Sequence, residues 1–370
     1  MKNPENLSTA AKPPRKKRLK RVLIALLCGF LIFQFILHPV AIAIGYECIF
    51  AMRFQPVDWM EFSASDFENL TVHRSDFQTK NGKTLAGFAY SQTNDDGQDK
   101  KGVVVFSHGL GIGGHNFYMP FIDYFTQNGY LAFAYDGTGN GESGGDITGL
   151  PQGVIDLDFA LRHVKSAAEY QNLPIVLFGH SWGGYAVGSV LNFHSDVRAV
   201  AMLAAFNSSK DQLVYQSVSH AGIIAYTGLP YLTLYEKLKF GKSYATASVV
   251  NGLKFSEAWA VIVQSADDPT VLPSHGYDIF LENFKDNERV EFVFYTDRGH
   301  KNILFSDDAL AYQDEMNAAY ERYLTERNAK HSEKLKSEFM QANLDKLRCF
   351  APNESLMQTI LGVYNARCTA

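Results

Sequence analysis

The sequence predicts an α/β fold with a mostly parallel central sheet and helices on both faces, preceded by an N-terminal transmembrane helix. Three observations support this prediction. Short apolar runs rich in β-branched residues alternate with helical patterns, which is typical of a buried parallel sheet. A charge-free run of 25 residues precedes the alternation. With 370 residues, 46% of them hydrophobic, the chain can bury a large core, which excludes disordered and disulfide-scaffold classes.

The N-terminus has the pattern of a membrane signal-anchor. Residues 1–21 carry eight basic side chains and one acidic one, and residues 22–46 carry no charge. About 20 apolar residues span a bilayer as a helix, and a basic flank stays in the cytoplasm. We predict a basic cytoplasmic segment over 1–21, a transmembrane helix over 22–46 and the rest of the chain outside the cytoplasm. Pro39 is expected to kink or end the most apolar part of this helix.

Two alternatives to an anchor remain. A cleaved signal peptide has an apolar region of about 7–15 residues and a small-residue cleavage site. Ala41-Ile42-Ala43 fits such a site weakly, and the apolar run is longer. A buried helix of a soluble protein would leave the basic flank without a role. The net charge of −5 for the whole chain argues against a nucleic-acid partner.

The body of the chain alternates between strand and helix patterns. After a connector over 47–70, we predict one domain over 71–327 and a helical tail over 328–370. Residues 207–257 interrupt the alternation and are predicted to form an apolar, aromatic cap. A turn signal, Asn81-Gly82, separates the first two strands. The predicted strands are Leu70–Phe77, Lys83–Thr93, Gly102–Ser107, Tyr130–Tyr135, Pro174–Phe178, Val197–Phe206, Trp259–Gln264 and Val290–Tyr295. The predicted helices are Asn116–Asn128, Val154–Tyr170, Trp182–Phe193, Ser274–Phe284 and a long last helix capped by Ser306.

The strongest chemical signal is a serine between glycines at a strand-to-helix junction. Ser181 follows a predicted strand and precedes a predicted helix, with Gly179 and Gly183 two residues away on either side. Such a tight turn needs small neighbours and exposes the serine hydroxyl above the sheet. The N-terminus of the following helix then directs backbone N–H groups towards a developing oxyanion. The pattern predicts a nucleophile at Ser181.

A glycine-rich loop over 108–115 follows another predicted strand. We assign the Leu110 N–H and the Trp182 N–H to an oxyanion hole. A phosphate-binding loop is the alternative, but the loop contains no lysine or arginine and no G-x-x-x-x-G-K-[ST] motif. His108 is interpreted as a structural hydrogen-bonding residue and His115 as an exposed loop residue.

A serine nucleophile needs a base, and the base needs an orienting carboxylate. Both should follow later strands of the same sheet. His300 follows the strand at 290–295 and is the predicted base. Asp268 follows the strand at 259–264 and is the predicted carboxylate, with Asp267 as the alternative. The order serine, aspartate, histidine is the one this architecture produces.

Residues 83–304 resemble the α/β-hydrolase superfamily, and within it the monoacylglycerol lipase, lysophospholipase and serine aminopeptidase-like group. The resemblance is carried by the elbow around Ser181, by His108-Gly109, by Asp136–Gly144 and by Gly299-His300.

The family's acid usually lies in a G-x-x-D-x-x-V motif. Here Ser265 replaces the glycine, while Asp268 and Val271 match. That match favours Asp268 over Asp267.

The resemblance implies a serine hydrolase that cleaves carboxylic esters of lipid or acyl type and needs no metal or cofactor. A serine aminopeptidase is the alternative, and it would need an acidic group for the substrate's ammonium, with Glu236 and Glu257 as candidates. An acyltransferase with the same triad stays open, as does a non-catalytic binding protein. The cap either receives an acyl chain or only packs on the core.

The four cysteines are Cys28, Cys48, Cys349 and Cys368, and none has the spacing of a metal ligand. If the domain lies outside the cytoplasm, Cys349 and Cys368 could form a disulfide, and two free thiols are the alternative.

Overall fold

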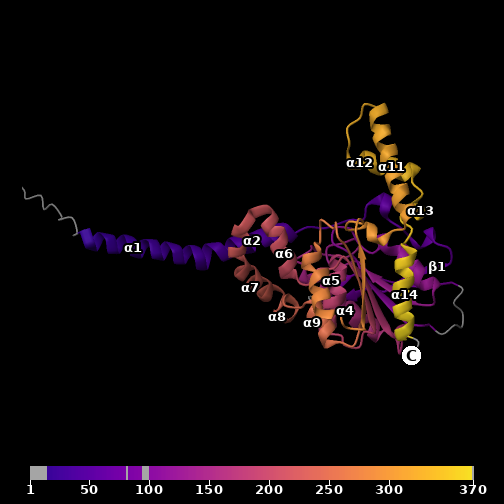
Figure 1. The fold of residues 1–370 in the computed structure, drawn as a ribbon, viewed down its shortest axis with the longest axis horizontal. Coiled ribbons are helices and arrows are strands. Elements are labelled where there is room, and N and C mark those ends of the chain that lie inside the picture. The colour runs from indigo at the N-terminus through magenta and orange to yellow at the C-terminus, as the bar shows by residue number, and fades with distance from the viewer. Residues whose placement is uncertain (1–14, 81, 94–99, 369–370) are drawn as a thin grey trace, which may run out of the picture.

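The computed structural model describes residues 15–80, 82–93 and 100–368. A long N-terminal helix leads into a domain whose helices lie on both faces of one sheet (Figure 1). The predicted basic residues Lys2 and Lys12, together with Glu5, lie outside the described residues. So do Asn81 of the predicted turn and most of the loop at 94–101.

Eight strands form the main sheet in the order β1-β4-β6-β5-β7-β8-β9-β10. The pairs β1–β4 and β4–β6 are antiparallel, and the other neighbours are parallel. The predicted mostly parallel sheet is therefore confirmed. The strands are β1 (Leu70–Arg74), β4 (Gly87–Gln92), β5 (Val103–Ser107), β6 (Leu131–Tyr135), β7 (Ile175–His180), β8 (Ala199–Leu203), β9 (Trp259–Ser265) and β10 (Val290–Tyr295).

The first two predicted strands are each divided in two. Their inner parts, β2 (Phe77–Gln78) and β3 (Thr84–Leu85), form a separate two-stranded sheet. At the break between β3 and β4, the N–H of Ala86 donates to the hydroxyl of Ser143, 2.8 Å away.

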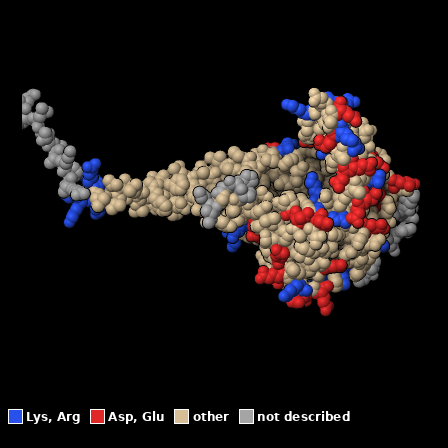
Figure 2. Space-filling model, turned by 45° about the horizontal axis from the view of Figure 1, so that its top comes forward, with Lys and Arg blue, Asp and Glu red and all other residues tan. Residues whose placement is uncertain are grey.

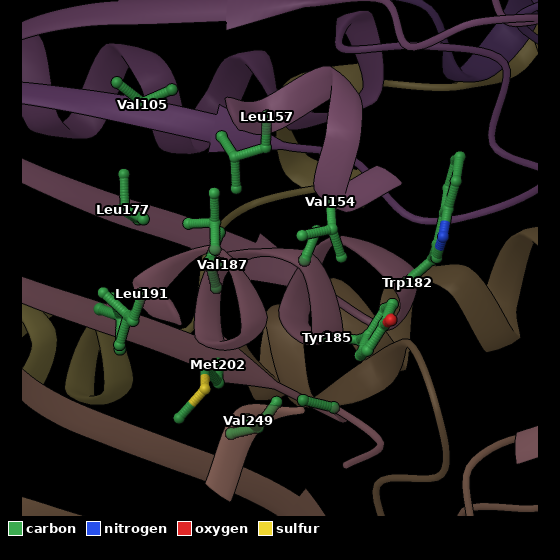
Figure 3. Close-up of a cluster of buried hydrophobic side chains, with 14 of the residues drawn as sticks. Val105, Val154, Leu157, Leu177, Trp182, Tyr185, Val187, Leu191, Met202 and Val249 are labelled. Atoms are coloured by element: carbon green, nitrogen blue, oxygen red, sulfur yellow. The ribbon is translucent and has the colours of Figure 1, made fainter. Parts of the chain in front are cut away.

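Helices cover each face of the sheet with its own apolar core. One face carries α4 (Pro151–Ser166), α5 (Trp182–Ser189), α9 (Val249–Phe255) and α10 (Tyr277–Phe284), and the other carries α3 (Met119–Gln127), α11 (Asp307–Glu326) and α14 (Glu354–Cys368). Figure 3 shows Val187 of α5 between Leu157 of α4 and the strand residues Leu177 and Met202. Full burial of such a side chain stabilises the fold by about 1.5–3 kcal/mol. This packing holds the start of α5 rigidly against the sheet.

The predicted helices are present, with shifted ends. A short 3₁₀ turn, Asn116–Tyr118, precedes α3, and α4 begins at Pro151. Proline suits the first helical position because its missing N–H is not needed there. The predicted cap of the long helix α11 is confirmed, since the Ser306 hydroxyl accepts the N–H of Ala309 at 3.2 Å.

The predicted cap region is helical. It contains α6 (Ser209–Ala221), α7 (Leu229–Phe240) and α8 (Lys242–Ala245), with a 3₁₀ segment, Gly222–Gly228, between the first two. The last helix of the region, α9, packs against α5 and belongs to the sheet cover. The cap therefore consists of α6 to α8.

The N-terminal helix continues through the predicted break. It comprises α1 (Arg15–Ile32), a π-helical turn (Phe33–Leu37) and α2 (His38–Phe50). Pro39 does not end it, because the N–H of His38 bonds to the carbonyl of Phe33 in a wider turn that accommodates the proline ring. Lys16–Phe50 is long and apolar enough to cross a membrane, and its most apolar stretch is exposed.

The end of the chain is part of the core. Two short helices, α12 (Glu333–Asn343) and α13 (Lys346–Cys349), lead to α14, which packs on the second face of the sheet. The buried hydroxyl of Tyr364 donates to the carbonyl of Leu177 in β7 at 2.5 Å. The predicted tail thus contributes its last helix to the core of the domain.

Of the two alternatives for Cys349 and Cys368, the structure has the free thiols and not the disulfide. All four cysteines are free. Cys349 precedes α14 and Cys368 is its last residue, so the 15-residue helix separates the two thiols by about 22 Å. A disulfide needs Cα atoms about 4.4–6.8 Å apart.

Truncation of a core side chain in α14 should destabilise the whole domain. Ile360 is fully buried, so Ile360→Ala should lower the free energy of unfolding by about 2–5 kcal/mol in urea titrations. Gln358 is exposed on the same helix, and Gln358→Ala should change that value by less than about 0.5 kcal/mol. Equal, small effects of both variants would show that α14 is a dispensable tail.

Candidate active site

The turn between β7 and α5 has the backbone that a nucleophile elbow requires. Ser181 lies at φ 58° and ψ −118°, a strained conformation for a residue with a side chain. A Cβ on Gly179 would lie 2.3 Å from the carbonyl oxygen of Gly183, and a Cβ on Gly183 would lie 1.9 Å from that of Ser107. Only glycine fits at these two positions, which is why the predicted spacing occurs.

The structure brings the three predicted catalytic side chains into one hydrogen-bonded row. Nε2 of His300 lies 2.9 Å from Oγ of Ser181, and Nδ1 of His300 lies 2.8 Å from Oδ2 of Asp268. With the Nδ1 proton donated to the carboxylate, Nε2 is free to accept the serine proton. The loops after β7, β9 and β10 supply the three residues, and these strands end at the same edge of the sheet.

The buried carboxylate of Asp268 accepts several hydrogen bonds from N–H groups. The N–H groups of Thr270 and Val271 donate to its Oδ1 at 2.8 and 2.9 Å, and the Gln264 amide donates to its Oδ2 at 3.1 Å. Burial alone would raise the pKa of Asp268, but the bond from His300 and these N–H donors outweigh burial and hold the pKa below its usual value. The carboxylate is therefore charged near neutral pH.

The neighbouring carboxylate, Asp267, has a different set of partners. It accepts the N–H of Gly299 at 2.7 Å and the hydroxyl of Ser265 at 2.6 Å. These bonds hold the loop that carries His300, while the imidazole itself is bonded to Asp268.

The residues predicted for the oxyanion hole lie on two adjoining segments. Trp182 is the first residue of α5, where an N–H has no acceptor within its own helix. Leu110 follows Gly109, whose Cα faces the elbow so closely that a Cβ there would lie 3.4 Å from the carbonyl oxygen of His180. The arrangement places both backbone segments beside Ser181.

The sequence did not indicate a second row of hydrogen bonds behind the elbow. The N–H of Gly109 donates to the Tyr118 hydroxyl at 3.1 Å, and this hydroxyl lies 3.0 Å from Nδ1 of His180. Nε2 of His180 lies 3.0 Å from the carbonyl oxygen of His300. The row connects the glycine-rich loop, the elbow and the histidine loop. Position 180 lies within the elbow motif, but no sequence pattern marks Tyr118 as its partner.

His180 should make the fold sensitive to acid. Burial, with a contribution from the neighbouring His300, lowers the pKa of His180 to about 3, whereas an unfolded histidine titrates near 6.5. Below pH ~6.5 the unfolded chain gains a proton that the folded chain does not. Stability from this residue is therefore complete above that pH and falls by up to about 1.4 kcal/mol per pH unit towards pH 3.

The measurement is urea unfolding of the wild type and of His180→Gln between pH 4 and 7. The variant should lose less stability on acidification than the wild type. The matched control, His331→Gln, replaces an exposed histidine and should follow the wild-type curve. Parallel curves for all three proteins would contradict the assignment.

The two histidines that flank the glycine-rich loop are both structural. Nε2 of His108 accepts the N–H of Gly137 at 2.8 Å, as expected of a structural hydrogen-bonding residue. His115 was expected to be exposed, and that prediction is wrong. It is buried, with Nδ1 2.8 Å from a carboxylate oxygen of Asp136 and Nε2 2.7 Å from the hydroxyl of Tyr90. The loop turns inward because Asp136 also accepts the N–H of His115.

A cavity of about 430 Å³ borders the loop that carries His300. Its apolar lining comes from the connector, from the 3₁₀ turn before α3 and from the C-terminal part of the chain rather than from the cap: Trp59, Met60, Phe117, Met316, Met340 and Phe350. Arg298, Lys301 and Lys336 also line it. The part of the chain that the structure describes contains no group of three or more His, Cys, Asp or Glu residues placed to hold a metal ion.

The acidic residues considered for binding an ammonium group have other partners. A carboxylate oxygen of Glu236 accepts the hydroxyls of Tyr46 at 2.8 Å and of Ser209 at 2.6 Å. Glu257 forms an ion pair with Arg289 at 2.9 Å.

A protein-family model described as serine aminopeptidase, S33, matches residues 98–284, about half of the chain. The chain belongs to this family. The match includes the elbow and the acid-bearing loop, and it confirms the resemblance to the α/β hydrolases that the motifs indicated.

Relatives of this serine aminopeptidase family member include proteins described as esterases. Caffeoylshikimate esterase from Arabidopsis thaliana is 36% identical over 114 residues, which are 30% of this chain and 33% of that protein. The chain thus matches about a third of the length of this curated relative. An esterase from Pyrococcus furiosus, in two crystal forms, superposes with TM-scores of 0.51 and 0.52 at 16% and 17% identity. The superpositions cover 75% and 74% of this chain and 98% of the esterase, and they show the shared fold.

Proposed function

We propose that the chain is a membrane-anchored serine hydrolase that cleaves carboxylic esters of lipid or acyl type through an acyl-enzyme. The observation that carries the proposal is the row from Ser181 through His300 to Asp268 at the carboxyl edge of the sheet. The strained elbow and the charged, buried Asp268 fit the roles of nucleophile and orienting group.

The first half of the reaction forms the acyl-enzyme. Nε2 of His300 takes the hydroxyl proton as Oγ of Ser181 attacks the ester carbonyl. The N–H groups of Leu110 and Trp182 stabilise the oxyanion, and each such donor is typically worth about 10²–10³ in rate. His300 then gives its proton to the leaving alcohol as the bond to that oxygen breaks.

The second half returns the enzyme to its starting state. Water takes the place of the alcohol, His300 accepts one of its protons, and the resulting hydroxide attacks the acyl carbonyl. The same two N–H groups hold the second oxyanion. His300 finally reprotonates Ser181 as the carboxylic acid leaves.

The surroundings of the site favour an apolar ester over a peptide. The cavity beside His300 has Trp59, Phe117, Phe350 and three methionines in its lining, and such side chains suit an acyl chain. A serine aminopeptidase would need a free acidic group near the nucleophile, and both candidates are bonded elsewhere. An acyltransferase would use the same residues with an alcohol acceptor in place of water.

The anchor and the topology belong to the same proposal. The helix over Lys16–Phe50 is apolar and exposed, and the basic residues at its start favour a cytoplasmic N-terminus. The catalytic domain would then lie outside the cytoplasm.

A substrate screen tests the reaction class. Full-length protein in detergent should hydrolyse p-nitrophenyl esters, with kcat/KM rising from acetyl to longer acyl chains as the apolar cavity fills. Aminoacyl-naphthylamides should be cleaved at least about 10²-fold more slowly, since Glu236 and Glu257, the two candidates for binding their ammonium group, already have other partners. The reverse order of the two substrate classes would select the peptidase alternative.

A further inference from the structure

The cap is bound along the anchor helix, within the part that we propose to span the membrane. The Gln34 amide donates to the Tyr231 hydroxyl at 2.6 Å, and the ring of His38 lies 4.9 Å from that of Tyr231. Tyr231 belongs to the first turn of α7, while Gln34 lies in the middle of the charge-free run. A polar pair at this depth ties the two helices together.

The contact between the anchor helix and α7 ends at a pair of charged residues. Glu47 is the first charged residue of the helix after Arg21, and it pairs with Lys239 near the end of α7. The Tyr235 hydroxyl donates to the same carboxylate at 2.5 Å. Glu47 lies thirteen positions after Gln34 in the same helix, so the Gln34–Tyr231 contact lies about 20 Å along the helix axis from Glu47.

The exposed side of α7 is apolar over the same length. Pro230, Leu234 and Leu238 recur at four-residue spacing, so they lie on one face of the helix, and all three are exposed. Leu234 is 53% exposed and Leu238 76% exposed. We call these three residues the α7 face.

The sequence that includes the α7 face contains no charged residue over a long stretch, like the anchor helix beside it. No Asp, Glu, Lys or Arg occurs from Gln212 to Tyr235, a run of 24 residues beside an anchor run of 25. Figure 2 shows the same pattern on the surface, where the shaft formed by the anchor is free of charge between the basic cluster at its outer end and the domain. The surface of a helical cap that faces only water normally carries charged and polar side chains, so their absence over this length favours an apolar environment.

We infer that the α7 face lies in the hydrocarbon layer of the membrane leaflet on the side of the catalytic domain. The inference rests on the proposed anchor and names the bilayer itself as the partner of the cap. Tyr231 to Lys239 is eight residues of α7, a rise of about 12 Å, which fits within half of a typical hydrocarbon core of about 15 Å. Lys237 and Lys239 lie near the other end of the helix, where long basic side chains reach the headgroups.

With α7 inserted, the catalytic domain contacts the bilayer through its cap as well as through the anchor helix. The cap begins at α6, six residues after the end of β8, and β8 is next to β7, which Ser181 follows. The cap is therefore joined to the sheet close to the active site. An ester dissolved in the leaflet can then reach the site beside the cap without crossing water.

Fluorescence quenching in vesicles measures the depth directly. Full-length Leu234→Trp is reconstituted in phosphatidylcholine vesicles, with Leu347→Trp as the matched control because Leu347 is a comparably exposed leucine on α13. Lipids brominated on their acyl chains should quench the tryptophan at position 234 at least about twice as strongly as the one at position 347, relative to the wild-type protein. Equal quenching, or a protein that does not float with the vesicles, would overturn the inference.

Kinetics separate this inference from the proposed function. Leu234→Asp should lower the rate on a fluorogenic ester embedded in vesicles by about tenfold, because a charge is unfavourable in hydrocarbon. The same variant should hydrolyse p-nitrophenyl acetate in detergent at the wild-type rate, and Leu347→Asp should leave both rates unchanged. A wild-type protein that hydrolyses neither ester would contradict the proposed function. Equal rates of the wild type and Leu234→Asp on the vesicle ester would contradict only the insertion of the cap.

Discussion

Replacing Ser181 with alanine should abolish ester hydrolysis, with kcat/KM falling by about 10⁴-fold or more. The variant keeps the proposed oxyanion donors and the cavity beside His300 but lacks the oxygen that we propose forms the acyl-enzyme, so only binding and electrostatic assistance would remain. Steady-state kinetics with p-nitrophenyl esters measure the loss. Alanine keeps the Cβ, so the backbone strain at φ 58° is unchanged, and the variant should lie within about 1 kcal/mol of the wild type in urea unfolding.

The matched control is Ser189→Ala. Ser189 is a buried serine of α5, two turns from the elbow, and the structure gives it no part in the catalytic row. This variant should keep activity within about threefold of the wild type. A Ser181→Ala protein that is folded and retains more than about 1% of wild-type activity would contradict the assignment of the nucleophile.

Asp268→Asn should lose about 10⁴-fold in kcat, because an amide in place of the carboxylate can hold the imidazole of His300 in the wrong tautomer. Asp267→Asn should lose less than about tenfold, because Asp267 supports the loop through the N–H of Gly299 and not through the imidazole. The two adjacent aspartates form a matched pair in the same loop. The reverse order of the two losses would move the orienting role to Asp267.

The pH profile separates an electrostatic role from a structural one. With Asp268 replaced, His300 is a poor base for the serine hydroxyl, so the residual activity should rise more steeply with pH as hydroxide takes over removal of that proton. A variant whose activity fell only because the loop had shifted would keep the wild-type profile.

The site could be predicted from the sequence because short-range constraints fix its parts. The glycines around Ser181 are required by backbone contacts of about 2 Å, so any chain with this turn must show the spacing. The acid and the base follow strands that end at one edge of the sheet, so their order along the chain predicts their meeting in space. Asp268 could be favoured over Asp267 only through the family's motif, since spacing alone allowed both.

The features that the sequence did not predict depend on distances between remote segments. His115 is buried because Asp136, 21 residues away, accepts its backbone N–H, and no local pattern reports that bond. Cys349 and Cys368 bracket a helix that packs on the sheet, and their separation follows from that packing. The cap was predicted as an apolar insertion, but its docking along the anchor became visible only through the contact between Gln34 and Tyr231.

The most direct test of the proposed chemistry is to locate the covalent adduct of a fluorophosphonate. Full-length protein is labelled in detergent, digested and sequenced by mass spectrometry, with Ser181→Ala treated in parallel. A single modified peptide carrying the phosphonyl group on Ser181, absent from the variant, is the predicted result. Modification at another serine, or full labelling of Ser181→Ala, would contradict an acyl-enzyme at this elbow.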